Sequence, residues 1–474
     1  MQIKSKFIFI TIFISIFFSI LYANFNIKNY DKNIINENGA STHLLIKNDA
    51  LRYFSHGYEI KQQLKNNVDY FETGRANFTK YLYPRIIALY YLVFDYSLYE
   101  DIEKKIISIG IHKNFLYFQI IFYYLSVLFL YFQIRKNIDV KYLFFSIFFL
   151  CLEPTIVQYH ASFWSESIFF SFQILIMGFI LSKNYSNFRL FLLGILLAFL
   201  ALQRTNGFYY FAPLLIYFYL YFNNKFDFLK KISIIAVGFI LITSLVGYHS
   251  LKRSGKFFIV PLEAKAALFA YAVPMILNEK ELEIEKENIL NLVEEKDIIY
   301  EDKDLSKLPY SQLGFTFCLR FDSLDTNSKY LEMCDYINNR SKILMITNPF
   351  DTLKFFIKSS LSFTILNPFH IFTDNKLNQD SKFYFSETHT KLKKYRIFYS
   401  LLIYLICLFG LIKIMKSQNK HILLFVVLSS LYFFLILSWH GNNRYFVPVL
   451  IYLSILFGYG ANSILSFFIK SNNN

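Results

Sequence analysis

The stretch Phe115-Leu-Tyr-Phe-Gln-Ile-Ile-Phe-Tyr-Tyr-Leu-Ser-Val-Leu-Phe-Leu-Tyr-Phe-Gln-Ile134 contains no charged residue, and Arg135 and Lys136 follow it directly. A helix needs about 20 mainly apolar residues to cross the hydrocarbon core of a bilayer. The stretch is long enough for one crossing, and a basic pair behind a span is typical of a cytoplasmic loop. This segment therefore predicts a transmembrane helix whose C-terminal end lies inside the cell.

The composition of the whole chain agrees with this interpretation. Of its 474 residues, 55% are hydrophobic and 20% aromatic, and the apolar residues lie in long blocks rather than at the spacing of an amphipathic helix or strand. This excludes a disordered chain, and 4 Cys are too few for a disulfide scaffold. A net charge of +15 would suit nucleic acid, but basic cytoplasmic loops explain it in a membrane protein, so we expect no nucleic-acid partner.

We predict an all-α fold, a polytopic membrane helix bundle with about ten spans, because the apolar blocks approach the length of a bilayer crossing. The expected spans are residues 7–23, 113–134, 142–160, 164–182, 189–203, 207–222, 231–249, 396–415, 421–438 and 444–469. Lys4 and Lys6 precede the first span, and no small-residue cleavage site follows it. We therefore expect an uncleaved anchor with its N-terminus inside.

Alternation of these spans predicts which side of the membrane each loop occupies. The basic clusters expected on the cytoplasmic side are Lys4 and Lys6; Arg135, Lys136 and Lys141; Lys183 and Arg189; Lys225, Lys230 and Lys231; and Lys413, Lys416 and Lys420. The long polar segments 24–112 and 250–395 then share the opposite face. The chain divides into an N-terminal transmembrane module, 1–249, with external loop 24–112, an external juxtamembrane segment of mainly helical loops, 250–395, and a C-terminal transmembrane module, 396–474. We expect an integral multi-pass protein of the cell (inner or plasma) membrane, with its active face non-cytoplasmic.

Residues 352–366 have the pattern of a helix lying on the membrane surface. The apolar residues Leu353, Phe356, Ile357 and Leu361 share one helical face, and Lys354, Lys358 and Ser362 share another. This separation favours an interfacial helix on the outer leaflet over a further span. A further span would also place the basic residues Lys413, Lys416 and Lys420 outside the cell, which contradicts the preference of basic loops for the cytoplasmic side.

The rest of the second external segment gives weaker signals. Residues 279–304 hold many acidic residues without interleaved His or a regular ligand spacing, so we expect a solvated helix or loop rather than a metal site. Cys318 and Cys334 both lie in this segment. An oxidising exterior permits a disulfide between them, and two free thiols are the alternative.

Polar groups at the outer ends of spans are the candidate functional residues, because ionisable groups in or near lipid are costly and are usually retained for a function. The candidates are Asp49 and Glu59 in the first external loop, and Glu153, His160, Glu166, Arg204, His440 and Arg444 further along. Each has a structural alternative. Asp49 suits a helix N-cap, Glu166 and Arg204 suit one structural ion pair, and Glu153 suits a bond to a neighbouring helix. His160 and His440 suit surface positions.

The order of these features along the chain resembles that of the GT-C superfamily of membrane glycosyltransferases. The features are an anchor, an external loop with Asn48-Asp49 and Tyr83-Pro84, Ser165-Glu166 at the start of a span, an Arg204-x-x-Gly207 turn, Asn348-Pro-Phe350, and Arg444-Tyr-Phe-x-Pro448 at the start of the last span. The chain looks most similar to the branch with protein O-mannosyltransferases and the aminoarabinose transferases of lipid A. The resemblance covers most of residues 1–249 and 345–469.

This resemblance implies a sugar donor carried on a polyprenyl phosphate and a glycan, lipid or protein acceptor at the outer face of the bilayer. The position that matches the family's catalytic acid is Asp49, which would act as general base in an inverting transfer. Arg204 and Arg444, with His440, would stabilise the departing phosphate, and Glu59, Glu153, His160 and Glu166 would complete the substrate site. We expect no cofactor. A divalent metal ion stays open as an alternative, although no carboxylate pair has a spacing that requires one.

Other classes of membrane protein stay open as alternatives. A multi-span transporter, or a flippase or polymerase for lipid-linked glycans, also uses many spans and few charges, although matched Gly or Pro breaks in two repeats are not found in this sequence. Many relatives have Asp-Glu where this chain has Asp49-Ala50. An inactive assembly factor is therefore a third alternative.

Overall fold

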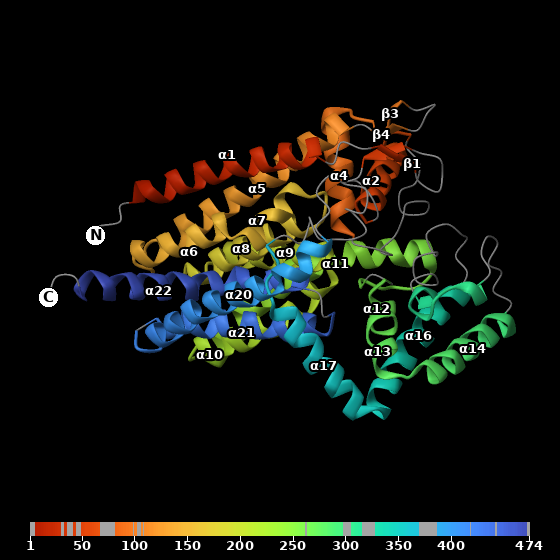
Figure 1. Cartoon of the computed structure of the whole chain (residues 1–474). Coiled ribbons are helices and arrows are strands. Elements are labelled where there is room, and N and C mark those ends of the chain that lie inside the picture. The colour runs from red at the N-terminus through yellow and green to blue at the C-terminus, as the bar shows by residue number, and fades with distance from the viewer. Residues whose placement is uncertain are drawn as a thin grey trace.

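The computed structural model describes residues 5–29, 33–35, 41–43, 49–66, 81–97, 99–101, 106–107, 109–260, 263–296, 305–314, 328–368, 386–417, 419–440 and 443–471. Within these ranges, long helices pack side by side in one bundle, and a smaller group of helices lies at one end of it (Figure 1). The predicted all-α class is confirmed. Two short antiparallel ladders were not expected: β1 (Asn33–Ile35) with β2 (Ser41–His43), and β3 (Tyr99–Asp101) with β4 (Ile106–Ile107).

Six helices are long and apolar enough to cross a membrane. They are α1 (Ser5–Asn29), α5 (Ile109–Ile134), α11 (Lys225–Ser254), α20 (Ser386–Met415), α21 (Lys420–Leu437) and α22 (Val447–Ser471). A seventh crossing results if α6 (Val140–Leu152), α7 (Pro154–Val157) and η2 (Gln158–Ala161) form one span with a bend of 44°. The bend falls at Glu153-Pro154, because proline lacks the backbone donor that would continue α6. The chain is therefore a membrane protein by the length and composition of its helices.

The expectation of about ten spans is not confirmed, because three of the apolar blocks form helices shorter than the roughly 20 residues of a full crossing. These are α8 (Glu166–Leu181), α9 (Asn187–Gln203) and α10 (Phe211–Tyr221), with 16, 17 and 11 residues. In α8, 14 of the 16 residues are buried. Its apolar composition therefore reflects burial among other helices, which hydropathy alone does not separate from contact with lipid.

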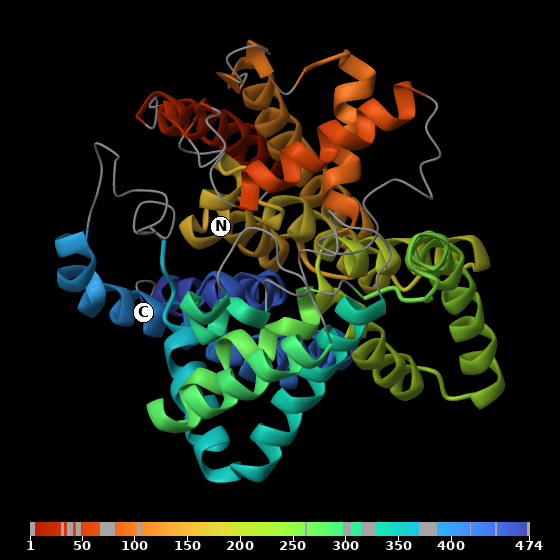
Figure 2. The same cartoon turned by 90° about the vertical axis from the view of Figure 1, so that its right-hand side faces the viewer.

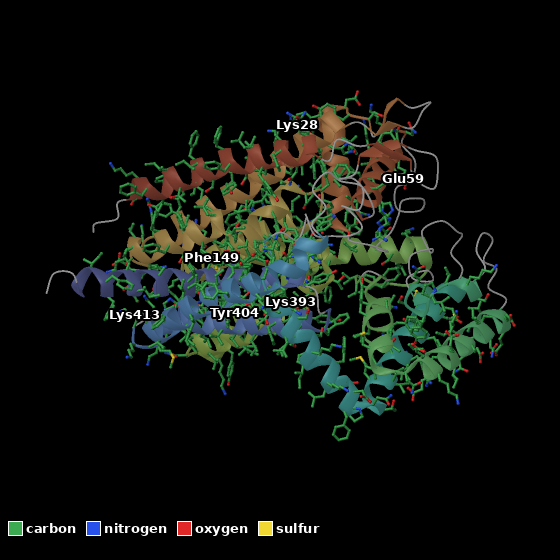
Figure 3. The ribbon with its side chains drawn as sticks, in the orientation of Figure 1. Lys28, Glu59, Phe149, Lys393, Tyr404 and Lys413 are labelled. Carbon is green, nitrogen blue, oxygen red and sulfur yellow. The ribbon has the colours of Figure 1, made fainter. Side chains whose placement is uncertain are left out.

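Both termini lie at one end of the bundle, and the polar segments lie at the other (Figures 1 and 2). The outer end carries α2 (Asp49–Lys65), α4 (Leu82–Phe94), α12 (Glu263–Tyr271), α13 (Val273–Ile276), α14 (Glu279–Glu295), α16 (Ser328–Thr347) and α17 (Pro349–Thr364). Figure 3 labels Lys413 toward the termini and Glu59 at the outer end. We name the end that carries these polar segments the outer end.

Two large hydrophobic cores and one small cluster hold the described residues together. The larger core includes residues from Ile8 to Tyr459, so helices from the first and last parts of the chain share it. The smaller core lies in the unit formed by α12, α13, α14 and α16, where the Phe269 and Tyr310 rings stack 4.1 Å apart. Arg340 donates two hydrogen bonds to Glu285 across this unit, one of them 2.9 Å long.

The acidic segment 279–304 forms α14 up to Glu295, with most of its acidic side chains exposed, and residues 297–304 lie outside the described residues. Cys334 is a buried free thiol in the smaller core. Its proposed partner Cys318 also lies outside the described residues.

At the outer end, α2 and α4 pack closely against each other. A Cβ added at Gly57 would lie 2.6 Å from the Ile87 side chain, so only glycine permits this approach. Lys65 donates to Asp95 at 2.6 Å and joins the C-terminal ends of both helices. The bond from Lys65, together with one from Lys61, holds the pKa of the Asp95 carboxyl below its usual range.

Glycines also determine the approach of α20 to α22. A Cβ at Gly460 would lie 1.8 Å from the backbone oxygen of Ile406, and a Cβ at Gly410 would lie 1.8 Å from that of Leu456. Small residues allow backbones to come close where no hydrophobic force drives helices together in lipid. Gly410 and Gly460 therefore determine how closely α22 packs against α20.

We expect Gly460→Leu to lower the free energy of unfolding by at least about 2 kcal/mol, because overpacking a close helix contact forces the backbones apart. Thermal unfolding of the detergent-solubilised protein measures the change. Ala461→Leu is the matched control, since Ala461 is the next residue and is only half-buried. Equal loss in both variants would contradict the assigned contact.

Candidate functional site

Three charged side chains from distant parts of the sequence meet near the outer end of the bundle. Glu166 is the first residue of α8, Arg204 follows the last residue of α9, and Arg444 lies in the turn η6 (Asn443–Phe446) that leads into α22. Their side chains are 1%, 7% and 12% exposed, respectively. The sequence predicted all three as site residues, and the structure brings them together.

One carboxylate oxygen joins the two arginines. Arg204 Nη1 donates to Glu166 Oε1 at 2.5 Å, and Arg444 Nε donates to the same oxygen at 2.5 Å. The Arg444 Nη2 also contacts this oxygen. Because a guanidinium group is always charged, the described part of the cluster contains two positive charges and one carboxylate.

Aromatic rings orient the two guanidinium groups. Arg444 lies over Trp164 with 3.9 Å between the guanidinium carbon and a ring centroid, and Arg204 lies 5.2 Å from the Tyr445 ring. Tyr159 is close enough to both arginines to interact electrostatically with them. Stacking on an aromatic face restricts a planar guanidinium group to few orientations. The cluster is therefore ordered by packing as well as by charge.

Tyr83 in α4 belongs to the first external loop and lies near this cluster. Its hydroxyl donates to Gln119 at 2.8 Å. Burial raises the pKa of Tyr83, and the charge of Glu166 raises it further. Tyr53 in α2 packs edge-on against Tyr83 at 5.3 Å. Asp49 begins α2 one turn before Tyr53, as the sequence predicted, and its side chain lies outside the described residues.

Glu153 lies in a pocket on the side of the bundle. It caps the start of α7 by accepting a hydrogen bond from the Thr155 N–H at 3.1 Å, and it accepts a second from the Tyr399 hydroxyl at 2.5 Å. The pocket has a volume of about 200 Å³ and is lined by Phe148, Phe149, Leu152, Glu153, Tyr399, Leu402, Ile403, Ile406 and Phe457. The bond from Tyr399 in α20 agrees with the alternative that Glu153 binds a neighbouring helix.

This pocket opens toward the surface that would face lipid. Its lining residues Phe148, Leu152 and Leu402 are 41%, 37% and 47% exposed, and all belong to α6 or α20. Figure 3 labels Phe149 between Lys413 and Lys393 along the length of the bundle. The pocket therefore lies between the two ends of the bundle, where a lipid chain from the bilayer can reach it.

The remaining predicted site residues lie elsewhere. His160 is fully buried rather than on the surface: its ring centroid lies 3.9 Å from that of Tyr123, and its Nδ1 lies 3.0 Å from Ser167 Oγ. Glu59 lies half-buried in α2 (Figure 3). His440 ends the turn η5 (Ser438–His440), and its side chain lies outside the described residues.

The sequence did not identify Tyr159 or Tyr399 as partners of the candidate residues. Tyr159 had a local signal, since it precedes His160 at the outer end of a predicted span. Tyr399 had none, because it lies 246 residues from Glu153 in the sequence. Among the described residues, no group of three or more His, Cys, Asp or Glu side chains is placed to hold a metal ion.

No family model, curated protein or solved structure matches the chain. The function is therefore inferred from the chemistry of the site. Two oriented guanidinium groups suit a phosphate, because their paired N–H donors match phosphate oxygens.

We expect Glu166→Gln to lower the free energy of unfolding by about 3–5 kcal/mol, because it leaves two buried guanidinium groups without their carboxylate. Arg204→Gln should cost less, since Glu166 then stays paired with Arg444 in a neutral cluster. Thermal unfolding in detergent compares the two variants. A larger loss in Arg204→Gln than in Glu166→Gln would contradict the charge balance described above.

Proposed function

We propose that this chain is a GT-C-type membrane glycosyltransferase that moves a sugar from a polyprenyl-phosphate donor to a glycan, lipid or protein acceptor. One observation carries the proposal: Arg204 and Arg444 converge on one carboxylate oxygen of Glu166 at the outer end of the bundle. A departing lipid phosphate gains negative charge as its bond to the sugar breaks. Preorganised guanidinium groups stabilise that charge.

The pocket at Glu153 supports a lipid-linked donor. Glu153 and Tyr159 are six residues apart along the helical segment α7–η2, a separation of roughly 10 Å at the rise of α- and 3₁₀-helices. Tyr159 in turn interacts electrostatically with both arginines. A polyprenyl chain in the apolar pocket would thus have its phosphate within reach of the arginine cluster.

The chemical step proposed here uses Asp49 as general base. Asp49 takes the proton of the acceptor hydroxyl while the acceptor oxygen forms a bond to the anomeric carbon. The bond between that carbon and the phosphate oxygen breaks, its electron pair stays on the polyprenyl phosphate, and the configuration inverts. The position of Asp49 at the start of α2 supports this role, because a helix N-terminus favours the ionised carboxylate.

We also propose that the protein lies in the cell membrane with its outer end on the non-cytoplasmic side. The short helices α8, α9 and α10 cross the membrane as well, so that the chain makes ten passes. The burial of α8 supports this, because non-helical backbone at membrane depth is tolerated where protein surrounds it, so the residues that flank α8 can complete the crossing.

We expect Asp49→Asn to lower sugar transfer by about 10²–10⁴-fold, the usual contribution of a general base, without a change in the unfolding midpoint. Membranes incubated with a panel of radiolabelled polyprenyl-phosphate sugars report transfer into glycan, lipid or protein. Glu283→Gln is the matched control, because Glu283 is an exposed carboxylate of α14 at the same end. Full transfer by Asp49→Asn would refute the role of Asp49. Movement of the donor across vesicles without transfer would indicate a flippase.

We expect Arg444→Lys to lower turnover by about 10²-fold, because lysine keeps the charge but loses the planar fork and the stacking on Trp164. The same transfer assay measures the loss, and thermal unfolding checks the fold. Lys113→Arg is a control for exchange of the two basic residue types. Unchanged turnover in Arg444→Lys would show that only the charge at this position matters.

A further inference from the structure

Helix α17 exposes a continuous apolar stripe at the outer end of the molecule. The exposed fractions of Phe350, Leu353, Ile357 and Leu361 are 85%, 56%, 52% and 66%. Their spacing of three or four residues places them on one face of the helix. The end of α16 extends the stripe with Ile343 and Ile346, which are 49% and 76% exposed.

The opposite face of α17 is already packed against other helices, and Phe355, Ser359 and Phe363 are buried on it. Phe355 lies in a small cluster with Ala272 and Ile276 of the unit formed by α12, α13, α14 and α16. Ser359 Oγ donates to the backbone oxygen of Ser438 at 2.6 Å, and the Phe363 ring lies 5.1 Å from Phe446. A surface helix in water has an apolar face toward the core and a polar face outward. Helix α17 is apolar on both faces, so its outward face requires an apolar environment.

The contacts of α17 determine its depth relative to the membrane. Ser438 directly follows α21, and Phe446 directly precedes α22, so both mark the outer ends of helices that cross the membrane. Helix α17 begins at the corner with α16, outside the bundle, and its C-terminal part reaches this level (Figures 1 and 2). At 16 residues it is about 24 Å long. The stripe therefore lies within one helix length of the membrane boundary.

The charged residues of α17 lie beside the stripe. Lys354 and Lys358 are exposed on one flank, together with Asp351, the single acidic residue of the helix. A lysine at the edge of an apolar face can cover that face with its aliphatic stem and reach lipid phosphate with its ammonium group. The net positive charge of this helix favours an anionic lipid surface.

We propose that α17 and the end of α16 lie in the headgroup region of the outer leaflet of the membrane that holds the bundle. Phe350, Leu353, Ile357 and Leu361 insert between the lipid chains. The unit with its own core, α12 to α16, is thereby attached to the membrane at its corner with α17 as well as through the chain. Phe356, which the sequence assigned to the apolar face, is instead half-buried beside the packed face.

Depth-dependent quenching in the full-length protein tests this proposal. The variants Leu353→Cys, Ile357→Cys and Asp351→Cys each carry a fluorophore, and each is reconstituted at one copy per nanodisc of phosphatidylcholine and phosphatidylglycerol. Lipids with a spin label near the headgroup should quench positions 353 and 357 at least about threefold more than position 351. The unsubstituted chain gives the background, since its described cysteines Cys151, Cys334 and Cys407 are buried.

Two results would overturn the proposal. Equal quenching at the three positions, with equal access of aqueous iodide, would place the stripe in water. Protection at 353 and 357 only when two copies share a nanodisc would assign the stripe to a second copy of this chain. Thermal unfolding of each labelled variant checks that the fold is intact. The outcome does not depend on sugar transfer, so failure of the proposed activity leaves this test valid.

Discussion

The shared carboxylate of Glu166 is the interaction on which the arrangement of the outer end depends. Arg204 and Arg444 both bind its Oε1, so one buried oxygen joins the start of α8, the end of α9 and the turn before α22. Burying three charges is tolerable only when each is paired, because an isolated charge away from water costs several kcal/mol. The pairing therefore restricts these three helix ends to positions that keep the cluster intact.

Other features of the molecule follow from the position of this cluster. Its location at one end of the bundle brings the first external loop close through Tyr83 and Tyr53. The bend at Pro154 turns the helical segment after Glu153 toward the cluster, and it leaves an apolar pocket beside the bend. The outer end of the bundle thus carries the charged site and α17, and the apolar pocket opens on the side of the bundle.

The sequence predicted the parts of the fold that depend on local composition. Apolar blocks identified all six helices long enough to cross a membrane, and Asp49 was correctly expected at a helix start. The sequence did not predict the environment of α8 correctly, because contact with lipid and burial in protein both favour apolar residues. In the structure, protein surrounds most of α8. The sequence also left open whether Glu166 and Arg204 form a structural pair. It placed Arg444 at the same site as Arg204 but did not predict that both bind Glu166.

The sequence by itself determined that the chain enters a membrane, since hydropathy sums over neighbouring residues and needs no knowledge of distant contacts. It also determined which residues are charged near the ends of apolar blocks. Only the tertiary structure decided which of these charges meet, because Arg204 and Arg444 lie 38 and 278 residues from Glu166. Contacts at such separations depend on how helices pack, including backbone approaches such as Gly410 with Gly460, and packing is a property of the whole bundle.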